Sequence, residues 1–546
     1  MSASSKKKLR KELNAAALTE KQQKAQAEAK KLKVFTTIFV IVMVVVLIAA
    51  LTVMAINAVR GSGIIEKNTV ALTVGEHEIN AVEMNYYFND AVNNTYSEWG
   101  TSYGEYLTYY LAMMGLDVTK PLDKQTYYDG EGTWADYFKD MAVNQAKANY
   151  ALYDAAIADG YTLNDTDKEV IENNLSGLQM YAMMNQVDLD TFVGLYYGAG
   201  AKEKSLRSYM EVVALANRYY TEHEESLSYD DTAIRAYEAD KYNNFSSYSY
   251  NSYYLGASDF LPEGVTEPTA EQTATALAEA KAAAESLLTA TNVIELDKAI
   301  AALEINAGAS SAESNAYENT LYTNISSSVQ EWISDPARQE NDIAVLPYET
   351  VVDHDHDENV EHEHEYETQG YYVVMFGSAT DNTQPMSNVR HLLVRFKTES
   401  DGSVTDENKA AAKAEAEGYL EQWKSGAATE DSFIELVKKH SADSSADQGG
   451  LFEEIHPDSA YVENFLNWSI DASRKTGDTE VIETEYGYHV MYYVGQDDMT
   501  YRDFMITEAM TAADMDTWYE GILNVTVTEG DLSKLPTDII LDPNAE

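Results

Sequence analysis

The stretches SNVRHLLVRF, residues 387–396, and TEYGYHVMYYVG, residues 484–495, decide the fold of this chain. Both are strand-like, because they are rich in β-branched and aromatic residues. Each carries one histidine, His391 in the first stretch and His489 in the second. The segments between them have helical character and are joined by the Ser/Asp/Gly-rich loop HSADSSADQGG, residues 440–450. The pattern predicts an α+β domain.

These ordered motifs resemble a parvulin-type (PpiC, or rotamase) peptidyl-prolyl isomerase domain. The matching segments are VRHLLV at 389–394, the loop at 440–450, the helix that contains Phe465, and TEYGYHV at 484–490. The resemblance implies an antiparallel sheet with surrounding helices over residues 383–497. It also implies an enzyme with peptidyl-prolyl cis-trans isomerase activity.

The resemblance further implies a catalytic site. His391 and His489 would lie on adjacent central strands and belong to a hydrogen-bonded network beneath the substrate amide. Asp443 stands where parvulins carry Cys or Asp and would act through its charge, whereas Thr484 would supply a buried hydroxyl. The alternatives are structural: histidines satisfied within a core, and an Asp that caps a turn or a helix.

The resemblance also implies a proline pocket. Phe465 would form one wall of this pocket, with Tyr461 one helical turn earlier on the same face, and Leu451 would join them in binding substrate. The family often has Met or another apolar residue at the position of Tyr461, and its turn after Gly449-Gly450 is usually longer. The alternative for both aromatic residues is that they are ordinary core residues of the domain.

Prolyl isomerisation breaks no covalent bond. It requires rotation about an amide whose barrier is about 18–20 kcal/mol, and a thousandfold acceleration needs only about 4 kcal/mol. A pocket that prefers the twisted amide and removes it from water can supply this difference. We therefore expect no cofactor, which agrees with a chain that contains no cysteine.

The composition limits the possible partners. The chain of 546 residues has a net charge of −53, with 91 acidic and 38 basic residues. Nucleic-acid binding depends on Lys and Arg contacts to phosphates, so this charge argues against a nucleic-acid partner. The absence of cysteine excludes a disulfide framework, a thiolate nucleophile and a lipid-attachment cysteine. The length allows roughly three or four domains.

The N-terminus predicts a membrane anchor. Residues 1–33 carry ten Lys or Arg and three Glu, hence +7, and residues 34–59 form an uncharged run of 26. Roughly 20 apolar residues span a bilayer. A cleaved signal peptide is the alternative, but its apolar core is normally about 7–15 residues long. We expect a single-pass protein of the cell membrane, with a cytoplasmic basic tail and the chain after Arg60 extracytoplasmic.

Three further segments complete the predicted organisation. Residues 60–230 have helical periodicity and resemble the helical domain of PrsA- and SurA-type extracytoplasmic foldases, with an unrelated helical bundle as the alternative. Residues 231–382 contain WISDPAR, which aligns with WSIDASR of the parvulin segment at a constant offset of 136. Because Tyr372 replaces His489 there, we interpret this segment as a degenerate parvulin-like domain. In SurA-type foldases a C-terminal segment returns to the helical domain, and residues 498–546 are expected to do the same.

An insertion at residues 352–368 is rich in histidine and acidic residues. Imidazole and carboxylate groups suit zinc, nickel or copper, so a weak metal site is one interpretation. The other is a solvated acidic loop, because the run lacks the fixed ligand spacing of a structural metal site. The histidines concerned are His354, His356, His362 and His364.

Two main functional hypotheses follow. The first is a membrane-anchored extracytoplasmic isomerase and foldase that acts on unfolded or proline-containing secreted polypeptides. The second is a non-catalytic chaperone whose parvulin folds serve only to bind peptides. The presence of both histidines in one copy, and their loss from the other, favours the enzyme. A third hypothesis is a metal-binding surface protein centred on residues 354–364.

Overall fold

The computed structural model describes residues 63–541 except 240, 304, 306–312, 352–365 and 401. The predicted basic tail and membrane segment, residues 1–59, lie outside the described residues, as do the four histidines of the predicted insertion. Helices and antiparallel sheets are both present, which confirms the α+β prediction. The chain divides into two compact units, one ending at Leu227 and resuming at Ala513, the other comprising Ser228–Ala512.

A helix that spans a membrane must be both long enough and apolar enough. Within the ranges that the structure covers, no helix has both.

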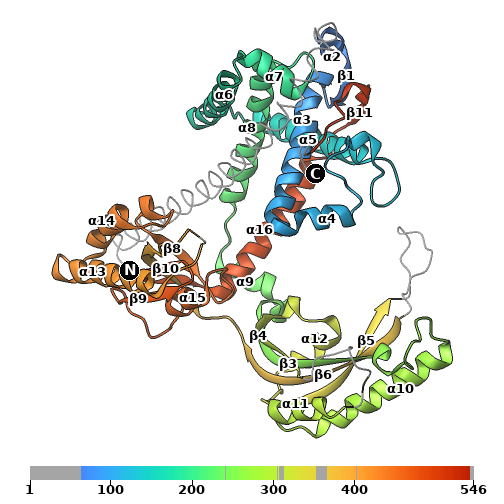
Figure 1. Cartoon of the computed structure of the whole chain (residues 1–546), viewed down its shortest axis with the longest axis vertical. Coiled ribbons are helices and arrows are strands. Elements are labelled where there is room, and N and C mark those ends of the chain that lie inside the picture. The colour runs from blue at the N-terminus through green and yellow to red at the C-terminus, as the bar shows by residue number, and fades with distance from the viewer. Residues whose placement is uncertain are drawn as a thin grey trace. The chain divides into compact units, whose positions relative to one another are not determined.

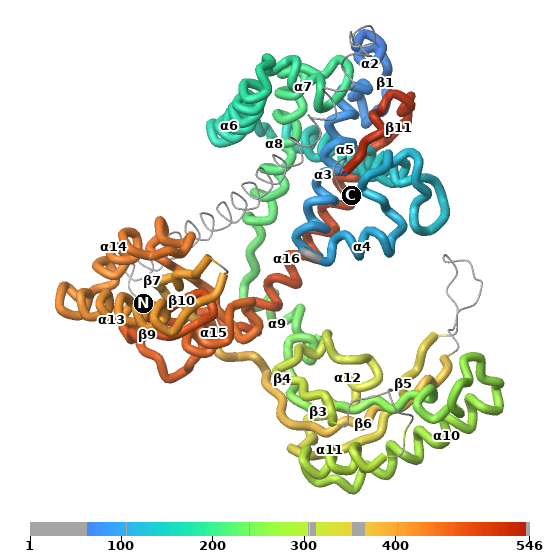
Figure 2. Tube along the Cα trace, viewed as in Figure 1, coloured from blue at the N-terminus to red at the C-terminus, as the bar shows by residue number. Residues whose placement is uncertain are grey.

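The first unit joins the two ends of the described chain in one small sheet. Strand β1 (Val70–Val74) pairs with β2 (His77–Asn80) through a turn at Gly75, and with β11 (Val527–Glu529) on its other side. Both pairings are antiparallel. In Figure 2 the red β11 accordingly lies beside the blue β1.

Helices make up most of the first unit. Asn164 begins α6 with a capping box, in which its side chain accepts a hydrogen bond from the Asp167 amide and the Asp167 carboxylate accepts one from the Asn164 amide. The Asp167 carboxylate also pairs with Arg218 at 2.9 Å, which ties α6 to α8. The helices are α2 (Ile64–Asn68), α3 (Ala81–Tyr103), α4 (Leu107–Met113), α5 (Trp134–Ala158), α6 (Asp165–Met184), α7 (Leu189–Tyr197) and α8 (Glu203–Ser226).

The core of the first unit contains an unusual number of buried tyrosines. Tyr86, Tyr87 and Tyr197 are fully or nearly fully buried, and the hydroxyl of Tyr209 donates to Asp90 at 2.6 Å. Burial raises the pKa of Asp90 to about 6, although the bond from Tyr209 opposes this effect. The tyrosine rings therefore fill the core, and the hydroxyl of Tyr209 supplies the hydrogen bond to Asp90.

The second unit contains two four-stranded antiparallel sheets whose elements follow one another in the same order. Each begins with a central strand, continues through two helices, an edge strand, one short helix and a second edge strand, and ends with the other central strand. The first consists of β3 (Ser247–Gly256), α10 (Ala270–Ser286), α11 (Val293–Ala301), β4 (Asn315–Leu321), α12 (Ser327–Ile333), β5 (Ile343–Val351) and β6 (Tyr366–Thr380). The second consists of β7 (Pro385–Arg395), α13 (Asp406–Ser425), α14 (Glu430–His440), β8 (Leu451–Ile455), α15 (Glu463–Ser469), β9 (Thr479–Thr484) and β10 (Gly487–Thr500).

The strand order is also the same in the two sheets. It is β4-β3-β6-β5 in the first and β8-β7-β10-β9 in the second. In the first sheet, α10 and α11 cover one face and α12 packs on the other (Figure 1). In the second sheet, α13 and α14 cover one face and α15 packs on the other. Each sheet thus has one face with two helices and one with a single short helix.

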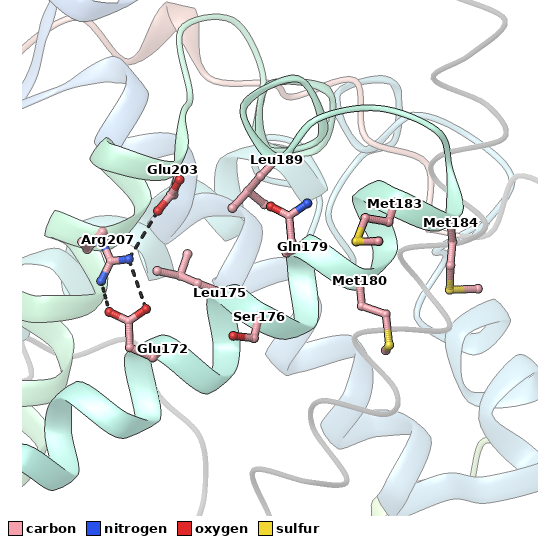
Figure 3. A pocket seen from close by; sticks show the side chains of 10 residues that line it. All are labelled: Glu172, Leu175, Ser176, Gln179, Met180, Met183, Met184, Leu189, Glu203 and Arg207. Carbon is pink, nitrogen blue, oxygen red and sulfur yellow. Dashed lines mark hydrogen bonds and ion pairs between the residues drawn. The ribbon is translucent and has the colours of Figure 1, made fainter.

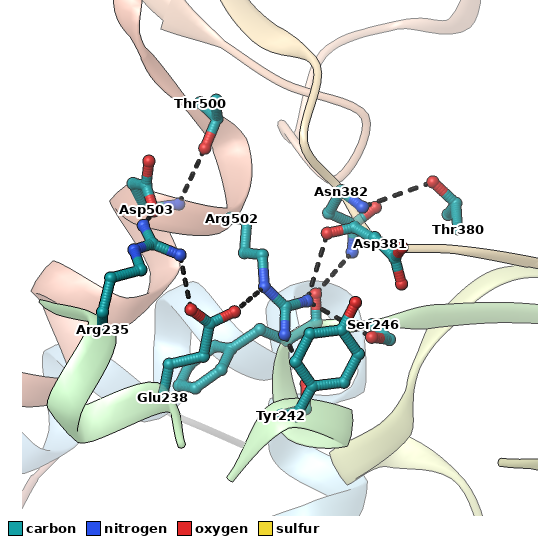
Figure 4. A network of polar contacts seen from close by, with 11 residues as sticks. Arg235, Glu238, Tyr242, Ser246, Thr380, Asp381, Asn382, Thr500, Arg502 and Asp503 are labelled. Carbon is teal, nitrogen blue, oxygen red and sulfur yellow. Dashed lines mark hydrogen bonds and ion pairs between the residues drawn. The ribbon is translucent and has the colours of Figure 1, made fainter. Parts of the chain in front are cut away.

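A buried arginine connects α9 (Asp231–Glu238), which precedes the first sheet, to α16 (Tyr501–Ile522), which follows the second. Arg502 is paired with Glu238 and donates to the carbonyl oxygens of Tyr242 at 2.6 Å and Asp381 at 3.1 Å (Figure 4). Its side chain also reaches the hydroxyl of Ser246 at 3.3 Å. One side chain therefore holds the segments through which the chain enters and leaves the first sheet.

Candidate active site

The two sequence-predicted histidines lie side by side in the second sheet. His391 of β7 pairs with Met491 of β10, and His489 pairs with Leu393, so the histidines are diagonal neighbours on one face. Their Nδ1 atoms are 2.8 Å apart and their rings stack at 5.0 Å with an angle of 17°. They are 2% and 5% exposed, respectively. Since only one proton can lie between the two Nδ1 atoms, one ring donates and the other accepts.

The histidine pair is extended at both ends by the other two predicted catalytic residues. Nε2 of His489 is 2.8 Å from the hydroxyl oxygen of Thr484, the last residue of β9. Nε2 of His391 is 3.5 Å from the carboxylate of Asp443, which is longer than an ordinary hydrogen bond. The structure therefore brings these four residues into one row, from Thr484 through the imidazoles to Asp443.

The loop after α14 positions the carboxylate of Asp443. The amide and hydroxyl of Ser445 both donate to Asp443, at 2.9 and 2.6 Å. The amide of Ala442 donates to the carbonyl oxygen of Leu393, which attaches the loop to β7. Burial raises the pKa of Asp443, but His391 and the two bonds from Ser445 outweigh burial and hold this pKa well below its usual range. Asp443 is therefore a carboxylate at neutral pH.

The protonation of His489 follows from its burial. Removal from water lowers its pKa most, the neighbouring His391 lowers it further, and the net pKa is about 3 although Asp443 opposes the shift. His489 is therefore neutral at neutral pH. A carboxylate only accepts hydrogen bonds, so Asp443 favours a proton on Nε2 of His391. If the proton of His489 is on Nδ1, this residue donates to Nδ1 of His391 and accepts from the Thr484 hydroxyl.

Three aromatic rings form a cup on this row. Phe465 of α15 lies edge-on to His391 and His489, at ring distances of 5.3 and 5.7 Å. Phe452 of β8 lies 5.0 Å from His391 and 5.6 Å from Phe465. Tyr461 contacts both phenylalanines, at 5.5 and 5.4 Å, and is 37% exposed. This ring cluster, which we call the aromatic cup, is buried at Phe465 and exposed at Tyr461.

Two details of the predicted pocket differ from the structure. Helix α15 begins at Glu463, so Tyr461 lies in the loop before the helix and reaches Phe465 from there, not from one helical turn earlier. Leu451 pairs with Arg390, whose side chain is on the opposite face from His391, because neighbouring residues of a strand alternate between faces. The structure does not bring Leu451 to the cup. Its neighbour Phe452, which sequence reasoning missed, takes that place, and strand alternation could have identified it.

A second residue missed at the sequence level supports the site from behind. Arg390 donates to the carbonyl oxygen of Gly449 at 3.1 Å and to Glu430 of α14 at 2.8 Å. Gly449 and Gly450 both have positive φ, +71° and +66°, and the Gly450 carbonyl accepts from the amide of His391 at 2.9 Å. The double glycine and Arg390 therefore fix the end of the loop against the strand that carries His391.

Metal binding by the described part of the chain would require ligand side chains that converge on one point. No group of His, Cys, Asp or Glu there is arranged to hold a metal ion. The predicted site at His354, His356, His362 and His364 lies outside the described residues.

A separate hollow occurs on α6 of the first unit, with a volume of about 590 Å³ (Figure 3). Met180, Met183 and Met184 are 53%, 68% and 67% exposed along its rim. At its other end Arg207 is held between Glu172 and Glu203. Exposed methionines are unbranched and polarizable, so they adapt to apolar groups of different shapes.

Comparison with known proteins agrees with this geometry. Residues 391–495 match the family model of the PPIC-type PPIase (rotamase) domain. No curated protein matches.

Several solved structures are similar over part of the chain. Peptidyl-prolyl isomerase PrsA of Bacillus anthracis is 22% identical over 26% of this chain and 58% of its own length, with a TM-score of 0.17. PrsA of Bacillus subtilis is 21% identical over 26% and 49%, with a TM-score of 0.18. A structure titled as a SurA-like chaperone of Campylobacter jejuni is 19% identical over 26% and 51%, with a TM-score of 0.15.

The matched part of this chain spans about half the length of these relatives. Their TM-scores are too low to support an argument about the whole chain, so the assignment rests on the family model. That model covers the segment in which the two histidines, the carboxylate loop and the aromatic cup occur. The second sheet domain of this chain is thus similar to the PPIC-type, or parvulin, peptidyl-prolyl isomerase domain over residues 391–495.

Proposed function

We propose that this protein is a peptidyl-prolyl cis-trans isomerase and that its site is the row Thr484, His489, His391 and Asp443 with the aromatic cup on it. The observation that carries the proposal is the buried 2.8 Å contact between two imidazoles, one of them neutral, directly beneath Phe465. Burial of two histidines costs free energy of folding, because a ring nitrogen that finds no partner in the protein loses its hydrogen bond to water. Perturbed and buried titratable groups of this kind are typical of functional sites.

The geometry supports a mechanism without a covalent step. A proline ring that packs among Phe452, Phe465 and Tyr461 places its preceding amide beside the imidazoles. The planar amide is more polar than the twisted one, so removal from water destabilises the planar form more. The neutral ring of His489 provides a weak, fixed donor or acceptor beneath the twisted amide. A preference of about 4 kcal/mol for the twisted form gives a thousandfold acceleration.

We extend the proposal to the cellular setting on the basis of the sequence. Residues 34–59 are uncharged and long enough to span a bilayer, and the ten basic residues before them favour a cytoplasmic N-terminus. The protein is then a membrane-anchored extracytoplasmic foldase whose substrates are unfolded or proline-containing secreted polypeptides. The mechanism requires no cofactor.

A second candidate function, a chaperone that holds peptides, is favoured by the methionine-lined hollow on α6. Three neighbouring methionines are each more than half exposed. Exposure of such an apolar patch to water is unfavourable, and binding of an apolar partner would remove it from water. The hollow suits apolar segments of unfolded chains. This function is compatible with the isomerase, because the hollow and the histidine row are in different units.

The decisive experiment compares isomerisation by the full chain and by variants. Proline-limited refolding of a model protein, and isomerisation of a short proline peptide, should both be accelerated by the parent. His391→Ala and His489→Ala should each lower kcat/KM at least about tenfold, or about 1.4 kcal/mol. His440→Ala, at the end of α14 and outside the row, is the matched control. Absence of acceleration by a folded parent would favour the chaperone instead.

A further inference from the structure

The first unit has a cluster of tyrosines at the end of α3, on α4 and around the start of α5. Tyr103, the last residue of α3, stacks on Tyr110 of α4 at 3.8 Å and 14°. Tyr127, in the loop before α5, stacks on Tyr137 of α5 at 4.6 Å and 15°. The ring of Tyr128 lies 4.5 Å from that of Tyr127. We call these five tyrosines the tyrosine platform.

Two tryptophans join the stacked pairs into one aromatic cluster. Trp99 lies 6.2 Å from Tyr110 and 5.9 Å from Trp134. Trp134 in turn lies 4.8 Å from Tyr127 and is buried. The platform therefore rests on a buried indole, and its tyrosines are attached to the core of the first unit.

A short hairpin holds the tyrosines of the loop. Thr126 and Thr133 form an antiparallel bridge, and the amide of Tyr127 donates to the carbonyl oxygen of Gly132 at 3.2 Å. Tyr128 lies within this hairpin and is 58% exposed. A ring that is held in place and yet exposed loses little conformational freedom when a ligand packs on it. Exposed apolar surface of this kind is typical of binding sites.

The charges of the segment that carries the platform limit the ligand. Residues 99–140 contain seven Asp or Glu, three Lys and no Arg. Each lysine is ion-paired with a carboxylate: Lys120 with Asp117 at 2.8 Å, Lys124 with Asp123 at 2.6 Å, and Lys139 with Asp136 at 2.9 Å. A polymer that bears phosphate or carboxylate groups would meet repulsion from this segment, and so would an anionic membrane surface. The ligand is therefore uncharged.

The platform suits an uncharged ligand with apolar faces and many hydroxyl groups. An aromatic ring is negative on its face, so C–H groups pack well on it. A pyranose ring has C–H groups on its faces and hydroxyl groups around its edge. The carboxylates of Asp129 and Glu131, exposed in the same hairpin as Tyr128, only accept hydrogen bonds, and sugar hydroxyls can donate them. An extended peptide offers only one backbone N–H per residue.

We propose that the tyrosine platform binds a neutral polysaccharide, whose pyranose rings pack on Tyr103 and Tyr128. Several neighbouring rings suit a polymer, because successive sugars of one chain can each contact a ring. This activity goes beyond the isomerase and does not depend on it, since the platform is in the first unit and the histidine row is in the second.

The test measures binding of defined oligosaccharides to the full chain by isothermal titration calorimetry. The probe is a hexamer of β-1,4-linked N-acetylglucosamine, and the control is a hexamer of galacturonic acid, which has a carboxylate on every ring. The protein is kept in a detergent without a sugar headgroup, because such a headgroup would compete. We expect a Kd below about 1 mM for the neutral hexamer and at least about tenfold weaker binding of the acidic one.

Variants connect this binding to the tyrosine platform. Tyr103→Ser and Tyr128→Ser each remove one outer ring and should weaken binding of the neutral hexamer about tenfold. Tyr128→Phe keeps the ring and should retain most of the affinity. Tyr366→Ser is the matched control, because Tyr366 is as exposed as Tyr128 but lies in the second unit. Circular dichroism checks that each variant is folded.

Three results would overturn the proposal. They are no binding of the neutral hexamer by a folded parent, equal binding of the neutral and acidic hexamers, and binding that Tyr103→Ser and Tyr128→Ser leave unchanged. If the neutral hexamer does not bind and Tyr128→Ser instead abolishes binding of an alternating leucine–alanine peptide, the platform serves a protein partner and the proposal fails.

Discussion

Replacing Gly450 by alanine tests whether the loop that carries Asp443 must contact β7 closely. Gly450 has a φ of +66°, and a Cβ atom there would lie 2.1 Å from the carbonyl oxygen of His391 and 3.0 Å from Val437. The first contact is with backbone, so it cannot be relieved by turning a side chain. Strand β8 and the end of the loop would have to move away from the strand that carries His391.

The expected cost can be worked from these contacts. A left-handed conformation costs an alanine about 1–2 kcal/mol. Separation of the strands also removes the 2.9 Å hydrogen bond from the His391 amide to the Gly450 carbonyl, worth about 1 kcal/mol. The two costs sum to about 2–3 kcal/mol, and the upper end corresponds to roughly a hundredfold more frequent opening of β7.

Hydrogen exchange measured by mass spectrometry on the full chain reports this opening directly. Peptides from β7 and β8 should exchange about a hundredfold faster in Gly450→Ala, and kcat/KM should fall because His391 moves with its strand. Gly477→Ala is the matched control. It lies in the same domain with a φ of +92° and has nothing within 4 Å of its Cβ position, so it imposes the backbone cost alone.

The comparison between the two glycines decides the outcome. If Gly450→Ala and Gly477→Ala have equal exchange rates in β7 and equal activity, close contact of the loop with β7 is not needed. The account of how Asp443 and His391 are positioned would then be wrong.

Three further predictions concern the cup, the pH response and the buried arginine. Phe452→Ala should raise KM for a proline peptide about tenfold in steady-state assays, whereas Leu451→Ala, on the opposite face, should not. Because the pKa of His489 falls from 6.5 in the unfolded chain to about 3 in the folded one, the unfolded chain binds the extra proton between these values. Stability in urea should therefore decrease as pH falls from 6.5 towards 3, and His489→Gln should reduce that slope. Arg502→Met should destabilise the second unit by about 1–3 kcal/mol in urea unfolding, because the carbonyl oxygens of Tyr242 and Asp381 lose a buried donor and Glu238 keeps only Arg235 as an ion-pair partner, and adding Glu238→Gln should recover part of the loss.

The sequence predicted the elements that carry the site better than the contacts between them. His391, His489 and Thr484 are at strand positions, and strands could be recognised from their composition. The contact between His391 and His489 depends on the register of β10 with β7. These two strands are the first and last of the domain, so they are far apart in sequence. A shift of β10 by one residue would send His489 to the face opposite His391. No local sequence pattern specifies this register, and only the resemblance to a family predicted that the two histidines are neighbours.

The pocket residues illustrate the limit at shorter range. Tyr461 was assigned to a helix that starts two residues later, because helix boundaries are poorly marked where no capping side chain is present. Leu451 and Phe452 both follow the double glycine, and the pairing of β8 with β7 is what puts Phe452 on the face of His391. Glu454, with a φ of +56°, interrupts β8 soon afterwards and obscures its alternation. The roles of these residues in binding remain predictions.

The pairing of β1 with β11 has a consequence for the order in which the chain matures. Leu72 pairs with Glu529, so the first unit has a sheet whose third strand is synthesised long after the first two. Contacts between residues so distant in sequence form slowly, because a long loop must close first. The helices of the first unit that are synthesised early therefore remain without β11 until the second unit has been synthesised. A ribosome pause or premature stop before Val527 would therefore leave one edge of β1 unpaired while β2 still covers the other, and an unpaired strand edge of this kind favours aggregation.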